Sequence, residues 1–197
     1  GGLYWALVRP SPKTGDRVEA LEVDPEVRGL IDQLGDDPQA RATLSSMGSK
    51  AVPPLLQILD AEPLDIPPER VQQVLIDIGP AAIAPLISYL KERRGVGLVR
   101  ILIVRVLGNI GGLPVVPGLV LALDDASEIV QAQAIEALGG LEPEIVPALL
   151  NRLTSPVHNL SPRARENLVR ALKSHAGPQI EPPLRRMQIL EKDPEVR

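Results

Sequence analysis

The chain has 197 residues, and its 21 Lys and Arg against 25 Asp and Glu give a formal net charge of −4, which disfavours general binding to nucleic-acid backbones. Aromatic residues make up 2% and Phe is absent, so stacking on bases or sugars is disfavoured and any core must be aliphatic. Because the chain has no cysteine, disulfides, thiolate zinc sites and thiol nucleophiles are excluded, and we expect no metal and no cofactor.

Residues 1–23 are predicted to be an apolar segment followed by a linker. The first eight residues are apolar and include Tyr4 and Trp5, and Arg9 follows them, an order typical of a helix end at the cytoplasmic membrane surface. Eight residues cannot span a bilayer, which takes about 20. We therefore expect the remnant of a membrane anchor, with Tyr4, Trp5 and Arg9 at the interface. The alternative is a hydrophobic plug packed on the first helices, or residues foreign to the natural protein.

A lone capping helix is predicted over residues 24–36. Asp24 offers a side-chain oxygen that can cap a helix, and Pro25 suits the first helical position. Apolar residues then recur at helical spacing, at Val27, Ile31 and Leu34. The same start signal, a capping side chain followed by proline, recurs at three later places: Asp37-Pro38, Ser161-Pro162 and Asp193-Pro194.

A short phrase built around a proline recurs five times between residues 37 and 190. Its prolines are Pro53, Pro85, Pro117, Pro147 and Pro182. A glycine precedes each proline by five to eight residues: Gly48, Gly79, Gly111, Gly139 and Gly177. Glycine accepts the left-handed conformation that ends a helix, and proline suits the first turn of the next helix. Each copy therefore predicts two antiparallel helices joined by a turn.

Apolar columns give each predicted helix pair a buried face. In the first helix they lie four and five residues before the glycine, as in Val74-Leu75 and Val106-Leu107, and only the fifth unit departs, with Lys173. In the second helix the column lies two residues after the proline, at Leu55, Ile87, Leu119, Leu149 and Leu184. A single pair cannot bury such a face, so the units must stack. We expect an all-α fold, an α–α superhelix of about five helical hairpins over residues 37–190.

First helices that end in Leu107-Gly108-Asn109-Ile110-Gly111 or Ala137-Leu138-Gly139, followed by the proline phrase, resemble the HEAT repeat. The likeness is strongest to the short repeats of bacterial phycobilisome-lyase HEAT-like proteins. The family's opening Asp-Pro-x-Val-Arg occurs at residues 24–28 and 193–197, so residues 191–197 are predicted to begin a further repeat or to form a C-terminal tail. The resemblance implies a HEAT-like solenoid whose second helices line a concave face where partners dock.

On that implied face, the position four residues after each proline is predicted to point outward. These candidate partner-binding residues are Gln57, Tyr89, Leu121, Asn151 and Arg186, with Arg152 beside them. Tyr and Arg dominate the energetics of many interfaces; the alternative is that these are solvated helix positions. Two basic clusters are further candidates for binding an acidic partner: Lys91 to Arg94 with Arg100 and Arg105, and Arg163, Arg165 and Arg170. The alternative is that they are solvated faces or i,i+4 partners of nearby acids.

No catalytic arrangement is predicted. His158 lies in a predicted loop and His175 near a helix end, while Asp124 and Asp125 precede Ser127, a predicted N-cap. We therefore expect a non-catalytic protein–protein interaction scaffold or adaptor with no small-molecule substrate. It would be a cytoplasmic subunit of a larger complex, which the N-terminal segment would tie to a membrane. The alternative, implied by the family resemblance, is a bilin lyase-like chromophore-attachment protein.

Overall fold

The computed structural model describes residues 24–34, 37–60, 66–92, 97–154 and 160–175, together with Pro182. Every regular element in these ranges is a helix, which confirms the all-α prediction. The α-helices are α1 (Pro25–Asp32), α2 (Pro38–Ser46), α3 (Val52–Asp60), α4 (Pro68–Ile78), α5 (Pro80–Lys91), α6 (Gly97–Ile110), α7 (Val116–Ala122), α8 (Glu128–Gly140), α9 (Val146–Thr154) and α10 (Pro162–Lys173). Short 3₁₀ turns precede three of them: η1 (Gly48–Ala51), η2 (Leu113–Val115) and η3 (Pro143–Ile145).

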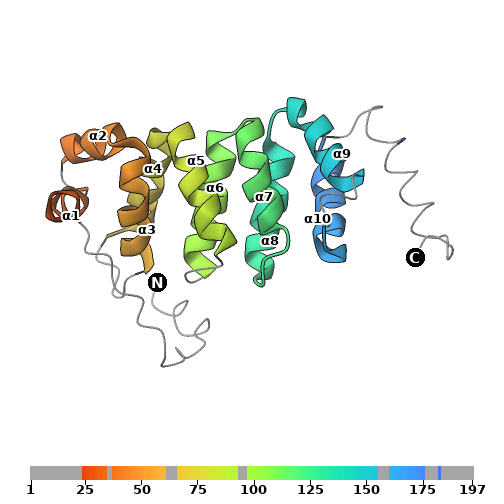
Figure 1. Cartoon of the computed structure of the whole chain (residues 1–197), viewed down its shortest axis with the longest axis horizontal. Coiled ribbons are helices and arrows are strands. Elements are labelled where there is room, and N and C mark those ends of the chain that lie inside the picture. Colours follow the sequence, from red (N-terminus) through yellow and green to blue (C-terminus); the bar gives the residue numbers. More distant parts are fainter. Residues whose placement is uncertain are drawn as a thin grey trace, which may run out of the picture.

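The helices follow one another along the long axis in chain order (Figure 1). The even-numbered helices form one layer, in which α2 packs on α4, α4 on α6, α6 on α8 and α8 on α10. In the second layer α3 packs on α5 and α5 on α7. Equivalent helices therefore lie side by side throughout the first layer and, in the second, from α3 to α7, whereas α9 packs on α10.

Three of the predicted helix starts are confirmed in atomic detail. The Oδ1 atom of Asp24 accepts a hydrogen bond from Glu26 N at 2.9 Å, and that of Asp37 accepts one from Gln39 N at 2.8 Å. The Oγ atom of Ser161 caps α10 by accepting from Ala164 N at 3.0 Å. Each cap is followed by a proline at the first helical position, where a missing N–H has no cost.

The predicted glycine turns are confirmed in the first three units and wrong in the fourth. Gly48, Gly79 and Gly111 have φ values of 61°, 66° and 73°, which favour glycine. Gly139 instead lies inside α8. A Cβ atom there would lie 2.7 Å from Ser174 Oγ, so this glycine lets the residues that follow α10 approach closely. Gly177 lies outside the described residues.

One aliphatic core runs from Val27 in α1 to Leu172 in α10. The predicted second-helix column is confirmed at three positions, where Leu55, Leu119 and Leu149 are fully buried. In the second unit the prediction is one residue out: Leu86 is fully buried and Ile87 only partly.

The error in the second unit arises because its proline is not equivalent to the others. Pro117 and Pro147 are second in α7 and α9, as Pro53 is in α3, whereas Pro85 lies inside α5. The helix α5 begins directly after Gly79, without the 3₁₀ turn that precedes α3, α7 and α9. Leu184, the fifth member of the predicted column, lies outside the described residues.

Candidate protein-binding surfaces

The predicted partner-binding column lies in the layer of second helices. Gln57, Leu121 and Asn151 occupy the same position of their helices, since Val52, Val116 and Val146 begin α3, α7 and α9. Asn151 is exposed, and the other two are half-buried, as is Arg152. Four predicted site residues lie outside the described part of the chain: Tyr4, Trp5, Arg9 and Arg186.

Tyr89 lies one position out of register with Gln57, because Ser88 is the equivalent residue of α5. The Tyr89 hydroxyl donates a hydrogen bond to Asp60 Oδ2, at the end of α3. Its phenol therefore joins α5 to α3 and is half-buried. A role for Tyr89 in partner binding stays a prediction. A partner would have to contact Tyr89 while its hydroxyl is hydrogen-bonded to Asp60.

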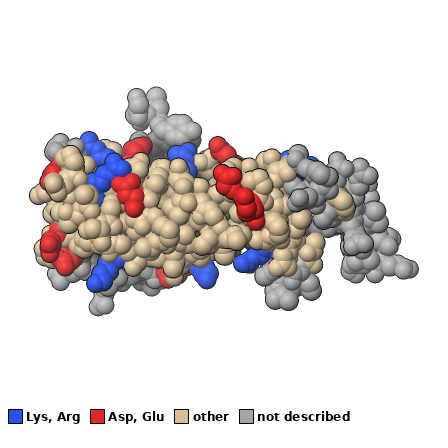
Figure 2. All heavy atoms as spheres, turned by 90° about the horizontal axis from the view of Figure 1, so that it is seen from above, with Lys and Arg blue, Asp and Glu red and all other residues tan. Residues whose placement is uncertain are grey.

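Seen from above, at the ends of the helices, the molecule carries mostly uncharged residues with scattered acidic and basic side chains between them (Figure 2). Two long stretches of the sequence, residues 78–90 and 106–123, carry no charged residue, and they include most of α5 and all of α7. The layer of second helices is thus largely uncharged in its middle. Depletion of charge is a property of the centres of protein–protein interfaces.

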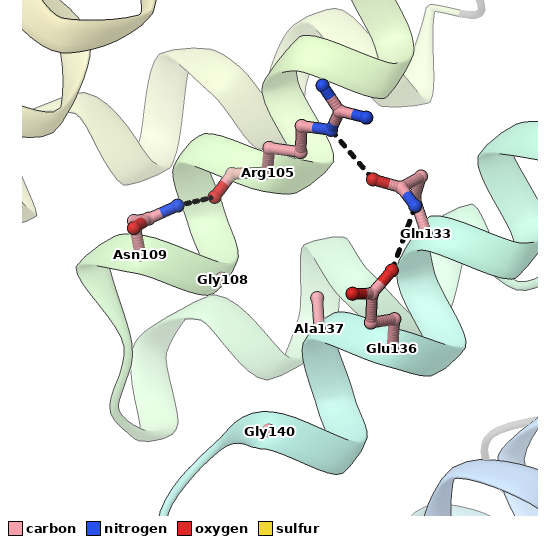
Figure 3. Close-up of a pocket in the computed structure, with 7 residues that line it drawn as sticks. All are labelled: Arg105, Gly108, Asn109, Gln133, Glu136, Ala137 and Gly140. Atoms are coloured by element: carbon pink, nitrogen blue, oxygen red, sulfur yellow. Dashed lines mark hydrogen bonds between the residues drawn. The ribbon is translucent and has the colours of Figure 1, made fainter.

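The other layer contains a groove that the sequence analysis did not predict. It lies between α6 and α8 and has a volume of about 510 Å³. At Gly108 and Ala137 the two helices approach closely, since a Cβ atom on Gly108 would be 3.0 Å from Ala137 Cβ. The remaining lining residues are Arg105, Asn109, Gln133, Glu136 and Gly140 (Figure 3).

A chain of hydrogen bonds crosses this groove. Arg105 Nε donates to Gln133 Oε1 at 2.7 Å, and Gln133 Nε2 donates to Glu136 Oε2 at 2.9 Å. In Figure 3 the terminal nitrogens of Arg105 point away from Gln133. The guanidinium of Arg105 and the carboxylate of Glu136 thus both line the groove, and the side-chain amide of Gln133 is hydrogen-bonded to each of them.

A smaller groove of about 200 Å³ lies between α2 and α4, lined by Leu34, Arg41, Glu69, Arg70 and Gln73. Arg41 Nε donates to Asp77 Oδ2, and Gln73 Nε2 donates to the other carboxylate oxygen at 3.1 Å. The Arg41 hydrogen bond lowers the pKa of Asp77 below its ordinary value, against the opposing effect of partial burial. The bond from Gln73 acts in the same direction.

In the first basic cluster, Arg100 pairs with an acid, which is the kind of alternative that the sequence left open, and it is largely buried. Its guanidinium holds Asp125 with two hydrogen bonds, Nε to Oδ2 at 2.8 Å and Nη2 to Oδ1 at 3.1 Å. Asp125 also accepts from the backbone N–H of Ser127 at 2.8 Å, which places this acid at the start of α8 as predicted. Ser127 occupies the predicted N-cap position but makes no side-chain cap, and Asp125 bonds the N–H of Ser127 rather than one inside the helix.

The polar contacts continue into α10. Asn167 Nδ2 donates to the carbonyl oxygen of Leu123 at 2.9 Å and to Gln131 Oε1 at 3.1 Å. Asp124 accepts from the Oγ atom of Ser161 at 2.7 Å. These bonds give both Asp124 and Asp125 structural roles between units.

Two further polar candidates, Arg170 and His175, also have structural partners. In the second basic cluster, Arg170 pairs with Glu166 one turn earlier on an exposed face. His175 lies 2.8 Å from the carbonyl oxygen of Leu138 through Nε2, which joins the end of α10 to α8. His158 lies outside the described residues. No described helix combines the length and the apolar character needed to cross a bilayer.

Comparison of the sequence with models of known protein families finds no match. Comparison with curated proteins also finds none.

Proposed function

We propose that this chain is a HEAT-like α-solenoid that acts as a non-catalytic scaffold or adaptor in a larger protein assembly. The observation that carries the proposal is the alignment of equivalent helices in two layers over one continuous core. In such an arrangement the outer faces of successive units join into extended surfaces, which repeat proteins use for binding.

Two surfaces of the array support the proposal. The largely uncharged second helices carry the row Gln57, Leu121 and Asn151 at equivalent positions. The first helices carry the groove between α6 and α8. The alternative, a bilin lyase-like protein, rests on family resemblance, and a fold does not by itself specify an activity.

The test is affinity purification of the tagged full chain from the cells that make it, after chemical cross-linking, with mass spectrometry of the cross-linked peptides. We expect a protein partner in stoichiometric amount, cross-linked to residues on one layer. A second assay offers a phycobilin and an acceptor protein to the isolated chain. Transfer of the bilin, or the absence of any stoichiometric partner, would contradict the proposal.

Alanine substitution separates the two candidate surfaces. If the partner docks on the second helices, Tyr89→Ala with Arg186→Ala should weaken partner retention while leaving the circular dichroism at 222 nm unchanged. Unaltered retention would remove the second-helix face from the proposal. The link to a membrane remains a proposal based on Tyr4, Trp5 and Arg9, and flotation of the full chain with anionic vesicles tests it.

A further inference from the structure

We propose that a second copy of this chain docks in antiparallel orientation on the turns that join first helices to second helices, and that Lys50 of each copy contacts Glu142 and Glu144 of the other. This inference goes beyond the proposed function, which concerns the binding of other proteins.

The turns that join first helices to second helices lie along one edge of the array, the upper edge in Figure 1, and Figure 2 views this edge from above. They contain η1, η2 and η3 and, in the second unit, the start of α5 after Gly79. Two equivalent positions are exposed in each of the first four units. The first is occupied by Ser49, Pro80, Leu113 and Pro143, and the second by Lys50, Ala81, Pro114 and Glu144. We call these residues, together with the exposed Glu142, the turn strip.

Charge changes sign along the turn strip. The first unit contributes Lys50, and the fourth contributes Glu142 and Glu144. The strip is uncharged between them, because both middle turns fall within the uncharged stretches 78–90 and 106–123. Within the described part of the chain, none of these three charged side chains forms an ion pair. A partner that matches the strip therefore places an acid opposite Lys50 and a cation opposite the two glutamates.

The middle of the turn strip is apolar and rigid. Leu113 is 54% exposed, and its neighbours on the strip are Pro80, Ala81 and Pro114. Proline and alanine lose almost no side-chain freedom when a partner covers them. Proline also has no N–H that burial would leave without a hydrogen bond. Covering this surface therefore removes apolar area from water at a low entropic cost.

A second copy of the chain supplies the matching charges. A two-fold rotation about an axis that lies in the plane of contact and crosses the strip at right angles brings the two strips together in antiparallel orientation. Lys50 of each copy then lies opposite Glu142 and Glu144 of the other. The axis falls midway between the first and fourth units, so Leu113 faces Pro80 and Ala81 of the other copy. A parallel pair would instead place like charges together at both ends, which disfavours it.

The size of the turn strip sets the expected affinity. Adjacent helices pack about 10 Å apart, so four turns span about 30 Å, and the two helix layers make the edge about 20 Å wide. The contact would bury about 600 Å² of each copy, whereas a standard interface buries about 800 Å² per partner. We therefore expect a reversible dimer with a dissociation constant in the micromolar range.

The first test measures the association of the full chain by sedimentation equilibrium between about 1 and about 300 µM, where such a dimer forms and dissociates. Leu113→Glu should weaken dimerisation about tenfold or more, because the two-fold symmetry places the added charge in the contact twice. The matched control is Ile129→Glu, which adds the same charge at a residue that is 59% exposed in the first turn of α8, at the opposite end of the helices. It should leave the dissociation constant unchanged. Circular dichroism checks that each variant keeps its fold.

Charge exchange tests the antiparallel orientation. Lys50→Glu, and separately Glu142→Lys with Glu144→Lys, should each weaken self-association about tenfold, because like charges then meet at both ends of the contact. An equimolar mixture of these two variants should form a mixed dimer as tightly as the wild type, since both ends again join opposite charges. A chain that carries all three substitutions should dimerise like the wild type for the same reason.

The inference is overturned if the wild type is a monomer at every concentration, or if Leu113→Glu and Ile129→Glu dimerise as tightly as the wild type. It is also overturned if a dimer forms that neither charge variant weakens, or if cross-links join the turn strip to another segment of the same chain. The proposed function is tested separately. A monomer that retains a different protein leaves the scaffold function standing, whereas a dimer that retains no other protein supports the turn strip and contradicts the scaffold function.

Discussion

The joint between α6, α8 and α10 and the joint between α2 and α4 connect equivalent helices with different polar chemistry. In the first, the side chains of Arg100 and Asp125 are 13% and 10% exposed and meet through two hydrogen bonds. In the second, Arg41 and Asp77 are 47% and 29% exposed and meet through one. Equivalent helices are therefore joined by a buried ion pair, Arg100 with Asp125, in one part of the structure and by a solvent-exposed ion pair, Arg41 with Asp77, in another.

Burial decides what each joint contributes to stability. An exposed ion pair exchanges hydration for a weak attraction and contributes little. A buried pair is not strongly stabilising as a whole, but removal of one partner leaves the other charge without compensation in a poorly solvated place. We therefore expect the two joints to differ sharply in their response to single substitutions.

The largest effect is expected for Asp125→Ala, which removes the two hydrogen bonds that Asp125 accepts from the largely buried Arg100 guanidinium. We expect a loss of about 3–5 kcal/mol in the free energy of unfolding. Urea denaturation followed by circular dichroism measures it. The double variant Arg100→Met with Asp125→Leu should be closer to the wild type than either single change, and a double variant at least as unstable as Asp125→Ala would argue against this explanation.

A smaller loss is expected for Asn167→Ala, because Asn167 is 4% exposed and donates to both Leu123 and Gln131. Its removal leaves a buried carbonyl and a buried amide oxygen with one bond fewer, at a cost of about 1–3 kcal/mol. Differential scanning calorimetry should show a lower Tm. An unchanged Tm would mean that water replaces the lost bonds.

The same Gly→Ala change should have opposite signs in two regions. At Gly118 in α7 a Cβ atom would lie 2.7 Å from Ile87 Cγ1 and 2.9 Å from Leu107 Cδ1, so overpacking should destabilise by about 1–3 kcal/mol. At Gly29 in α1 nothing lies within 4 Å, and the better helix propensity of alanine should stabilise by about 0.5–1 kcal/mol. Thermal denaturation of both variants checks the signs, and equal signs would refute the packing argument.

The smallest effect is expected at the exposed joint. Asp77→Asn should cost under about 1 kcal/mol at neutral pH. Because the pKa of Asp77 is lowered in the folded chain, the contribution of its pair with Arg41 is present above the unfolded carboxyl's pKa of about 4 and is lost as the pH falls through the lower folded value. The difference between variant and wild type in urea denaturation should therefore shrink as the pH is lowered below about 4. A difference that grows on acidification would contradict the assigned direction.

Features that depend on a single residue type in a local pattern could be predicted from the sequence. Asp24, Asp37 and Ser161 cap helices because each stands before a proline at a helix start. Gly79 and Gly111 end helices because only glycine adopts their φ values readily. Most of the aliphatic core could be predicted as well, because apolar residues recur at helical spacing within each helix.

Features in which one residue type can serve two purposes could not be predicted. Gly139 matched the spacing of a helix-ending glycine, but it serves a close approach by Ser174, and nothing local distinguishes the two. Pro85 matched the proline of the other units although it lies inside α5. The groove between α6 and α8 escaped prediction because the sequence does not show that Gly108 in one helix faces Ala137 in the other.

The measurement that tests the account most directly is native mass spectrometry of the full chain purified gently from its own cells. We predict a defined complex of the chain with a protein partner in stoichiometric amount. A chain that appears alone would contradict the scaffold function.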